Sequence, residues 1–137
     1  MHQGKQSLGA MTAAAALLIG LTLAAPLSGQ ISTGTITGTV TDPQGAAMAN
    51  VAVTVVHTDT NFESRTVTNS EGLYRVQSLQ PGPYRVTFES PGFKRVVQSG
   101  LDLRTGDVLP VNVRMEIGQL TDSVQISAQG TLLETET

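Results

Sequence analysis

The sequence predicts an all-β fold, a sandwich of two antiparallel sheets with about seven strands. Sixteen of the eighteen Thr and all fourteen Val lie beyond residue 30, and β-branched side chains favour strands. Short runs of alternating apolar and polar residues occupy this region, with Gly, Pro and Asn turns every eight to twelve residues. Beyond residue 30, apolar residues do not recur at helical spacing over a useful length.

The first half of this region predicts one strand followed by a hairpin. Apolar residues and Gly alternate with Thr across residues 35–41, and the turn at 42–45 has Pro43, whose fixed φ suits a β-turn. Val51, Val53 and Val55 alternate in the next strand, which ends near His57. The polar turn at 58–61 then leads to a returning strand over 63–68.

The second half predicts further strands that are separated by turns at 69–72, 80–83 and 91–92. Each strand places its apolar residues on one face, so the strands can share one core. The apolar positions are Tyr74, Val76 and Leu79; Tyr84, Val86 and Phe88; residues within 93–98; and Leu109, Val111, Val113, Met115 and Ile117 in a last alternating strand. Pro110 lies on the opposite face of that last strand, which suits the beginning of a strand or a sheet edge.

The few aromatic residues are predicted to serve packing. Tyr74, Tyr84 and Phe88 occupy inward registers, which favours a place in the core over a stacking surface for sugars or bases. Phe93 lies between a Pro-Gly turn and the basic pair Lys94-Arg95. We expect Phe93 to cap one end of the sandwich, and an exposed contact residue is the alternative.

Residues 1–29 are predicted to be a cleaved secretory signal peptide. Lys5 supplies a positive charge, residues 10–25 form an apolar stretch, and Pro26 to Gly29 provide a helix stop and small residues. The apolar stretch is shorter than the roughly 20 residues that a membrane-spanning helix needs. Cleavage after Gly29 leaves a chain with eleven acidic and seven basic residues, a net charge of −4.

Residues 118–137 depart from the pattern of the preceding strands. Gly118 to Thr121 interrupts the alternation, residues 123–127 form one short alternating run, and the polar end contains Leu132 and Leu133. The short run has no obvious partner strand in the sequence. We therefore interpret 118–137 as a linker and the start of a further domain, and 30–117 as the sandwich domain.

Composition excludes several classes of protein. The absence of Cys removes disulfide scaffolds, thiol nucleophiles and thiolate metal sites. The net charge of −3 for the whole chain does not fit a non-specific nucleic-acid binder, and the apolar content of 39% is too high for a disordered chain.

Catalytic and metal-binding sites are not predicted. His57 is the one His beyond residue 30, whereas a zinc peptidase needs two or three His or carboxylate ligands. A serine hydrolase would also need a nucleophile elbow, which is missing. We interpret His57 as a solvated residue at a strand end. Asp59 to Glu63 hints at calcium ligands but lacks the Gly and the closing Glu of an EF-hand loop, so a hairpin turn is preferred.

An ordered series of motifs resembles the carboxypeptidase regulatory-like domain family over about residues 34–116. The matching segments are Gly34 to Asp42, Gly45, Asn50 to Val53, Thr68, Gly72 to Tyr74, Leu79, Pro81 to Tyr84 and Pro91 to Phe93. The resemblance implies a seven-stranded, transthyretin-like sandwich of immunoglobulin-like Greek-key type, similar to Cna protein B-type domains. It implies no peptidase activity. Some B-type domains contain a crosslink between a Lys on the first strand and an Asn on the last. Asn112 is present, but the first strand has no Lys and Lys94 lies far along the chain, so this crosslink is not expected.

The layout of the chain also resembles the N-terminus of Oar-like TonB-dependent outer-membrane receptors. The segments that carry this resemblance are the leader, the sandwich, Gly118 to Ala128 and Leu132 to Thr137. It implies a non-catalytic periplasmic accessory module of a Gram-negative bacterium, which provides spacing or protein contact. The implied partners are the plug and barrel of the same receptor and a periplasmic protein, which an edge strand such as the one containing Pro110 could bind by strand addition.

A secreted carbohydrate-binding module is the alternative function, since starch-binding domains share this type of sandwich. The absence of Trp and the scarcity of exposed aromatic residues weaken this alternative. No cofactor, no enzyme activity and no nucleic-acid partner is expected, and a membrane would be reached only through a barrel that these residues do not include.

Overall fold

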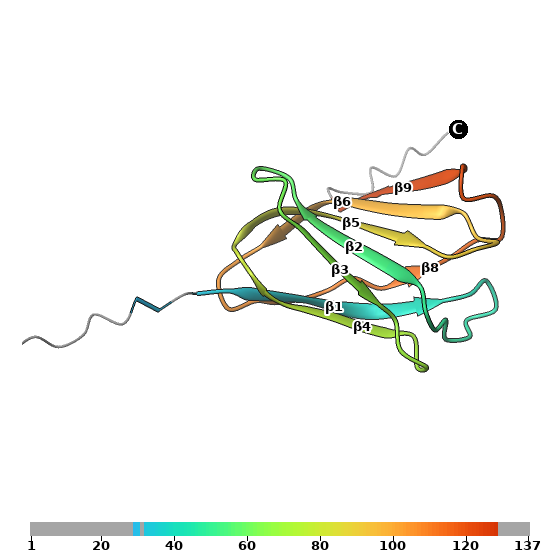
Figure 1. Cartoon of the computed structure of the whole chain (residues 1–137), viewed down its shortest axis with the longest axis horizontal. Coiled ribbons are helices and arrows are strands. Elements are labelled where there is room, and N and C mark those ends of the chain that lie inside the picture. Colours follow the sequence, from blue (N-terminus) through green and yellow to red (C-terminus); the bar gives the residue numbers. More distant parts are fainter. Residues whose placement is uncertain (1–28, 31, 129–137) are drawn as a thin grey trace, which may run out of the picture. The chain divides into compact units, whose positions relative to one another are not determined.

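Figure 1 shows the computed structural model, which describes residues 29–30 and 32–128. The chain divides into two units, Met1–Ile31 and Ser32–Thr137, and the second unit forms the sandwich. The predicted signal peptide lies outside the described residues except for its last position, Gly29. Within the described ranges, no helix is long and apolar enough to span a membrane.

The predicted all-β sandwich is confirmed, and its strands form two sheets (Figure 1). One sheet has the order β4-β1-β7, with β8 also paired to β1, and the other has the order β3-β2-β5-β6-β9. The strands are β1 Gly34–Thr41, β2 Ala52–His57, β3 Glu63–Val67, β4 Leu73–Leu79, β5 Gly82–Glu89, β6 Arg95–Leu103, β7 Val108–Pro110, β8 Val113–Arg114 and β9 Ser123–Ser127.

The strand pairing is more mixed than the predicted antiparallel arrangement of about seven strands. The pairs β1–β4, β2–β3, β2–β5 and β5–β6 are antiparallel, as predicted. The pairs β1–β7, β1–β8 and β6–β9 are parallel. Parallel neighbours need a long crossing connection, which a pattern of local hairpins does not reveal.

The alternating run from Leu109 to Ile117 is not one strand, contrary to the prediction. It forms β7 and β8 with a break between them, and Ile117 is 74% exposed instead of facing the core. Pro110 has no N–H with which to continue a ladder. In the break, the Asn112 side-chain oxygen accepts a hydrogen bond from the Thr39 backbone N–H at 2.9 Å. As predicted, the strand that contains Pro110 lies at a sheet edge.

The run at 123–127 was expected to lack a partner in the sandwich, and the structure shows otherwise. This run is β9, and it extends the second sheet by pairing with β6 from Arg95↔Ser123 to Ser99↔Ser127. The partner strand β6 is distant from β9 in the sequence. The side chains of β9 are mostly exposed, so the alternation within β9 did not indicate which strand it pairs with. Leu132, Leu133 and the rest of 129–137 lie outside the described residues.

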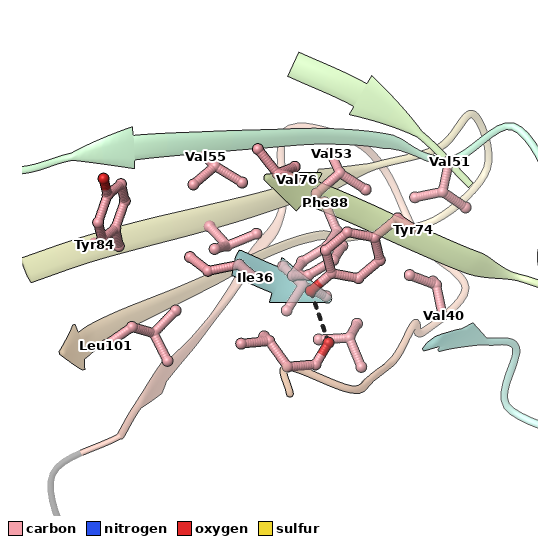
Figure 2. Close-up of a cluster of buried hydrophobic side chains, with 14 of the residues drawn as sticks. Ile36, Val40, Val51, Val53, Val55, Tyr74, Val76, Tyr84, Phe88 and Leu101 are labelled. Atoms are coloured by element: carbon pink, nitrogen blue, oxygen red, sulfur yellow. Dashed lines mark hydrogen bonds between the residues drawn. The ribbon is translucent and has the colours of Figure 1, made fainter. Parts of the chain in front are cut away.

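Both sheets contribute to a single core. The tyrosines and Phe88 predicted to face inward are buried, and Tyr74 meets Phe88 edge to face with ring centres 5.5 Å apart (Figure 2). The buried apolar residues are Ile36, Val40, Val51, Val53, Val55, Tyr74, Val76, Leu79, Tyr84, Val86, Phe88, Val96, Leu101, Leu103, Val111, Val113 and Met115. Phe93 is partly buried against this cluster, as expected of a residue that caps the sandwich.

Tyr74 connects the core to residues 111–112, which lie beside β1 between β7 and β8. Its buried hydroxyl donates a hydrogen bond to the Val111 carbonyl oxygen at 2.7 Å, which is the dashed line in Figure 2. Gly38 lies on the buried face of β1 between Ile36 and Val40, and a Cβ atom added to it would overlap the same carbonyl oxygen. Glycine therefore lets the Val111 carbonyl lie close against the buried face of β1.

Replacing Gly38 with Ala is expected to destabilise the domain by about 2 to 4 kcal/mol, because the added methyl group must displace backbone. Urea unfolding followed by circular dichroism measures the change. Gly118→Ala is the matched control, since its Cβ would meet only the flexible side chain of Lys94. Equal stability of the two variants would contradict the close approach at Gly38.

Tyr74→Phe is expected to lower the free energy of unfolding by about 1 to 3 kcal/mol at neutral pH, because the buried Val111 carbonyl loses its donor. Urea unfolding of the two proteins at pH 7 measures this difference.

Burial raises the pKa of Tyr74 above its ordinary value of 10, and burial also raises the pKa of Tyr84. Above about pH 10 the unfolded chain therefore releases phenol protons that the folded chain retains, so stability falls as pH rises.

Urea midpoints measured across the alkaline range test this pH dependence. The wild-type midpoint should fall more steeply above about pH 10 than that of Tyr74→Phe, which retains only the contribution of Tyr84. Parallel midpoint curves for the two proteins would show that Tyr74 ionises alike in the folded and unfolded chains.

Candidate functional site

Two turns meet at one end of the sandwich, one joining β2 to β3 within the second sheet and one connecting β4 of the first sheet to β5 of the second. β2 ends at His57, whose N–H bonds to Phe62 O at 2.9 Å and whose carbonyl accepts from Asn61 N at 2.8 Å. Asn61 has a φ of 56°, a left-handed value that Asn tolerates in turns. The turn from β4 into β5 lies beside this hairpin, because His57 pairs with Tyr84. The predicted hairpin turn at 58–61 is confirmed.

His57 is buried, so its interpretation as a solvated strand-end residue was wrong. It is 5% exposed, and its ring packs edge to face on Tyr84 with ring centres 4.8 Å apart. Gly82 provides the space, since a Cβ atom added there would overlap the imidazole. The sequence contains Gly82 in a Pro-Gly-Pro turn, but which side chain would lie over it depends on the pairing of β2 with β5.

Hydrogen bonding assigns the proton of the neutral imidazole. Nε2 of His57 lies 3.3 Å from the carbonyl oxygen of Pro81, and a carbonyl only accepts, so Nε2 carries the hydrogen. Nδ1 is then an acceptor, and it is buried without a hydrogen-bond partner. Nearby, the Tyr84 hydroxyl donates to Gln80 O at 2.7 Å, which fixes the turn that contains Pro81.

A pocket of about 340 Å³ lies at this end of the sandwich. It is lined by His57, Thr60, Phe62, Ser78, Gln80 and Tyr84. Phe62 is 63% exposed, so its ring is available at the pocket. Composition and spacing gave no indication of this site, because its walls come from three strands and two turns that only the fold brings together.

A second hollow of about 540 Å³ lies on the outer face of the β5-β6-β9 sheet. It is polar, and an ion pair between Glu89 and Arg95 forms part of its lining. At the end of the sandwich opposite the pocket, beside the β5–β6 turn, Lys94 pairs with Glu116 at 3.3 Å. Since both charges of each pair are satisfied locally, this face resembles a solvated sheet surface more than a binding site.

The described residues contain no group of three or more His, Asp or Glu placed to hold a metal ion. Asp59 lies in the β2–β3 turn, and Glu63 begins β3 and pairs with Arg65. Asn112 accepts hydrogen bonds from both the N–H and the hydroxyl of Thr39. The Asn112 side chain, which a Lys to Asn crosslink would have used, therefore hydrogen-bonds the segment after β7 to β1.

Comparison with known proteins identifies the fold family. The model of the carboxypeptidase regulatory-like domain matches residues 35–116. The chain belongs to this family. The match spans β1 to β8, so this regulatory-like domain includes the core, the Tyr74 contact and the pocket, while β9 lies beyond it.

The chain is also similar to part of the TonB-dependent transporter Oar from Myxococcus xanthus, with 37% identity over 93 residues. That stretch is 67% of this chain and 9% of the transporter, so the chain spans about a tenth of the relative's length.

Solved structures share the fold at low sequence identity. The Bacillus anthracis TIE protein matches 63% of this chain over 17% of its own length, with 19% identity and a TM-score of 0.55. Hydroxyquinol 1,2-dioxygenase from Pseudomonas putida matches 64% of this chain over 57% of its own length, with 13% identity and a TM-score of 0.51. At such identities only the fold is shared, and the dioxygenase does not indicate an activity for the regulatory-like domain.

Gly82→Ala is expected to cost about 2 kcal/mol more than Gly92→Ala in urea unfolding. Both glycines have positive φ, 143° and 81°, so Ala strains the backbone at either position. Only Gly82 also supports a ring, that of His57, and a Cβ atom at Gly92 would meet nothing within 4 Å. Equal costs would show that the packing of His57 on Gly82 does not contribute to stability.

Proposed function

We propose that this domain is a non-catalytic, periplasmic accessory module of a TonB-dependent outer-membrane receptor, which it serves by spacing or by protein contact. The observation that carries the proposal is the 37% identity to the Myxococcus xanthus transporter. In this proposal residues 1–29 are a cleaved leader, 30–117 form the accessory domain, and 118–137 lead towards a plug-like domain. The pairing of β9 with β6 means that the first part of this connection packs on the sandwich.

Free strand edges support a role in protein contact. β4 ends the first sheet and β3 ends the second, so each has one side without a neighbouring strand in the described part of the chain. β3 and β4 also contact each other, so their edges border the same side of the sandwich. Val67 and Leu73, which belong to these two strands, are exposed apolar residues.

The edge formed by β7 is less suited to strand addition than the sequence suggested. It has three residues and ends at Pro110, which cannot donate a backbone hydrogen bond. β4 has seven residues, with a regular stretch from Leu73 to Gln77 before Ser78 adopts a left-handed φ of 58°. An extended segment of the receptor or of a periplasmic protein would therefore pair with β4.

Fractionation of the source bacterium tests the proposal, with detection by an antibody raised against residues 32–128. We expect the antibody to detect an outer-membrane polypeptide far larger than 14.3 kDa, whose peptide map lacks residues 1–29. The size is expected because the related transporter is about ten times longer than the matched stretch.

A protein of about 14 kDa or less in the soluble periplasmic fraction would contradict the receptor module and leave a free exported domain. A cytoplasmic protein that retains residues 1–29 would contradict export as well. Antibody absorbed with the purified domain is the control for specificity in each fraction.

A further inference from the structure

We propose that the pocket between the β2–β3 and β4–β5 turns binds a neutral sugar ring. This inference is independent of the receptor module proposed above, because it concerns a ligand site within the sandwich itself. The pocket volume of about 340 Å³ is at the lower end of the roughly 300 to 1,000 Å³ that is typical of ligand sites. A site of this size accommodates one or two sugar rings, and a long glycan would extend into solvent.

The walls of the pocket exclude a charged ligand. Its six lining residues, His57, Thr60, Phe62, Ser78, Gln80 and Tyr84, include no Asp, Glu, Lys or Arg. A carboxylate or phosphate group would lose hydration on entry without gaining a counter-charge. The ligand should therefore be uncharged and still polar enough to bond with hydroxyl and amide groups.

The same walls combine an apolar surface with polar groups, as a sugar ring requires. Phe62 presents an exposed ring, against which the C–H face of a pyranose can pack. Thr60, Ser78 and Gln80 are exposed at the pocket, where their hydroxyl and amide groups can bond to sugar hydroxyls. A purely apolar ligand would leave these groups without partners.

His57 lines the pocket and is 5% exposed, so it shapes the wall and does not supply a hydrogen-bonding group to a ligand. Its Nδ1 has no partner and almost no exposed surface, and its Nε2 lies 3.3 Å from the Pro81 carbonyl oxygen.

One residue of the pocket wall has an uncommon backbone conformation. Ser78 has a left-handed φ of 58° and lines the pocket. Such conformations are enriched where they position groups for binding.

Titration of the full, isotope-labelled chain by NMR tests the proposal. The probes are glucose, galactose, mannose, maltose and cellobiose, with glucuronic acid as the charged counterpart. We expect at least one neutral sugar to shift the amide signals of residues 60–62 and 78–80 and the imidazole nitrogens of His57, whereas glucuronic acid shifts none of them. Phe62→Ala should weaken the binding about tenfold, because it removes the apolar surface.

Val108→Ala is the matched control, since Val108 is 58% exposed on β7 and does not line the pocket. It should leave the sugar affinity unchanged. Absence of shifts near the solubility limit of every neutral sugar would overturn the proposal, and so would equal affinity of Phe62→Ala and wild type. Shifts caused by glucuronic acid alone would overturn the inference that the ligand is neutral. None of these outcomes depends on whether the chain belongs to a receptor.

Discussion

The hydrogen bond from Tyr74 to the Val111 carbonyl, made directly over Gly38, is the contact on which the first sheet depends. It joins β4 to the segment between β7 and β8, which lies on the other side of β1. Without a side chain at Gly38, this segment can approach β1 closely, and both β7 and β8 pair with β1 in parallel. The aromatic ring of Tyr74 also reaches Phe88 of the other sheet, so one residue links three parts of the core.

The opposite end of the core is also built from a glycine and a tyrosine hydroxyl, but one of its buried polar atoms has no hydrogen-bond partner. A glycine again lies beneath a ring, here Gly82 beneath His57, and a tyrosine hydroxyl again donates to a backbone carbonyl, here Tyr84 to Gln80. At the Tyr74 end the buried polar atoms have partners, whereas at the His57 end Nδ1 has none. Hydrogen-bonded polar groups stabilise a core, whereas the buried Nδ1 without a partner makes the His57 end less stable than the Tyr74 end.

The sequence allowed prediction of those features that depend on local alternation. The strands over 35–41, 51–57 and 63–68, the inward tyrosines and the capping role of Phe93 could all be predicted, because side-chain direction follows from a period of two. Pairing between distant segments could not. The break after Pro110, the partner of β9, the burial of His57 and the pocket each depend on which strands become neighbours, and no residue pattern within one strand encodes that choice.

The register of the strands places the pocket at the end where the chain enters and leaves the described sandwich. β1 begins at Gly34, opposite Leu79, and β9 finishes at Ser127, opposite Ser99 of β6, which continues to Leu103 opposite Gly82. β1 therefore begins near the β4–β5 turn, and β9 runs in the direction of that turn. In a receptor that continues beyond β9, the chain would leave the second sheet at its β9 edge, heading towards the end of the sandwich that contains the pocket.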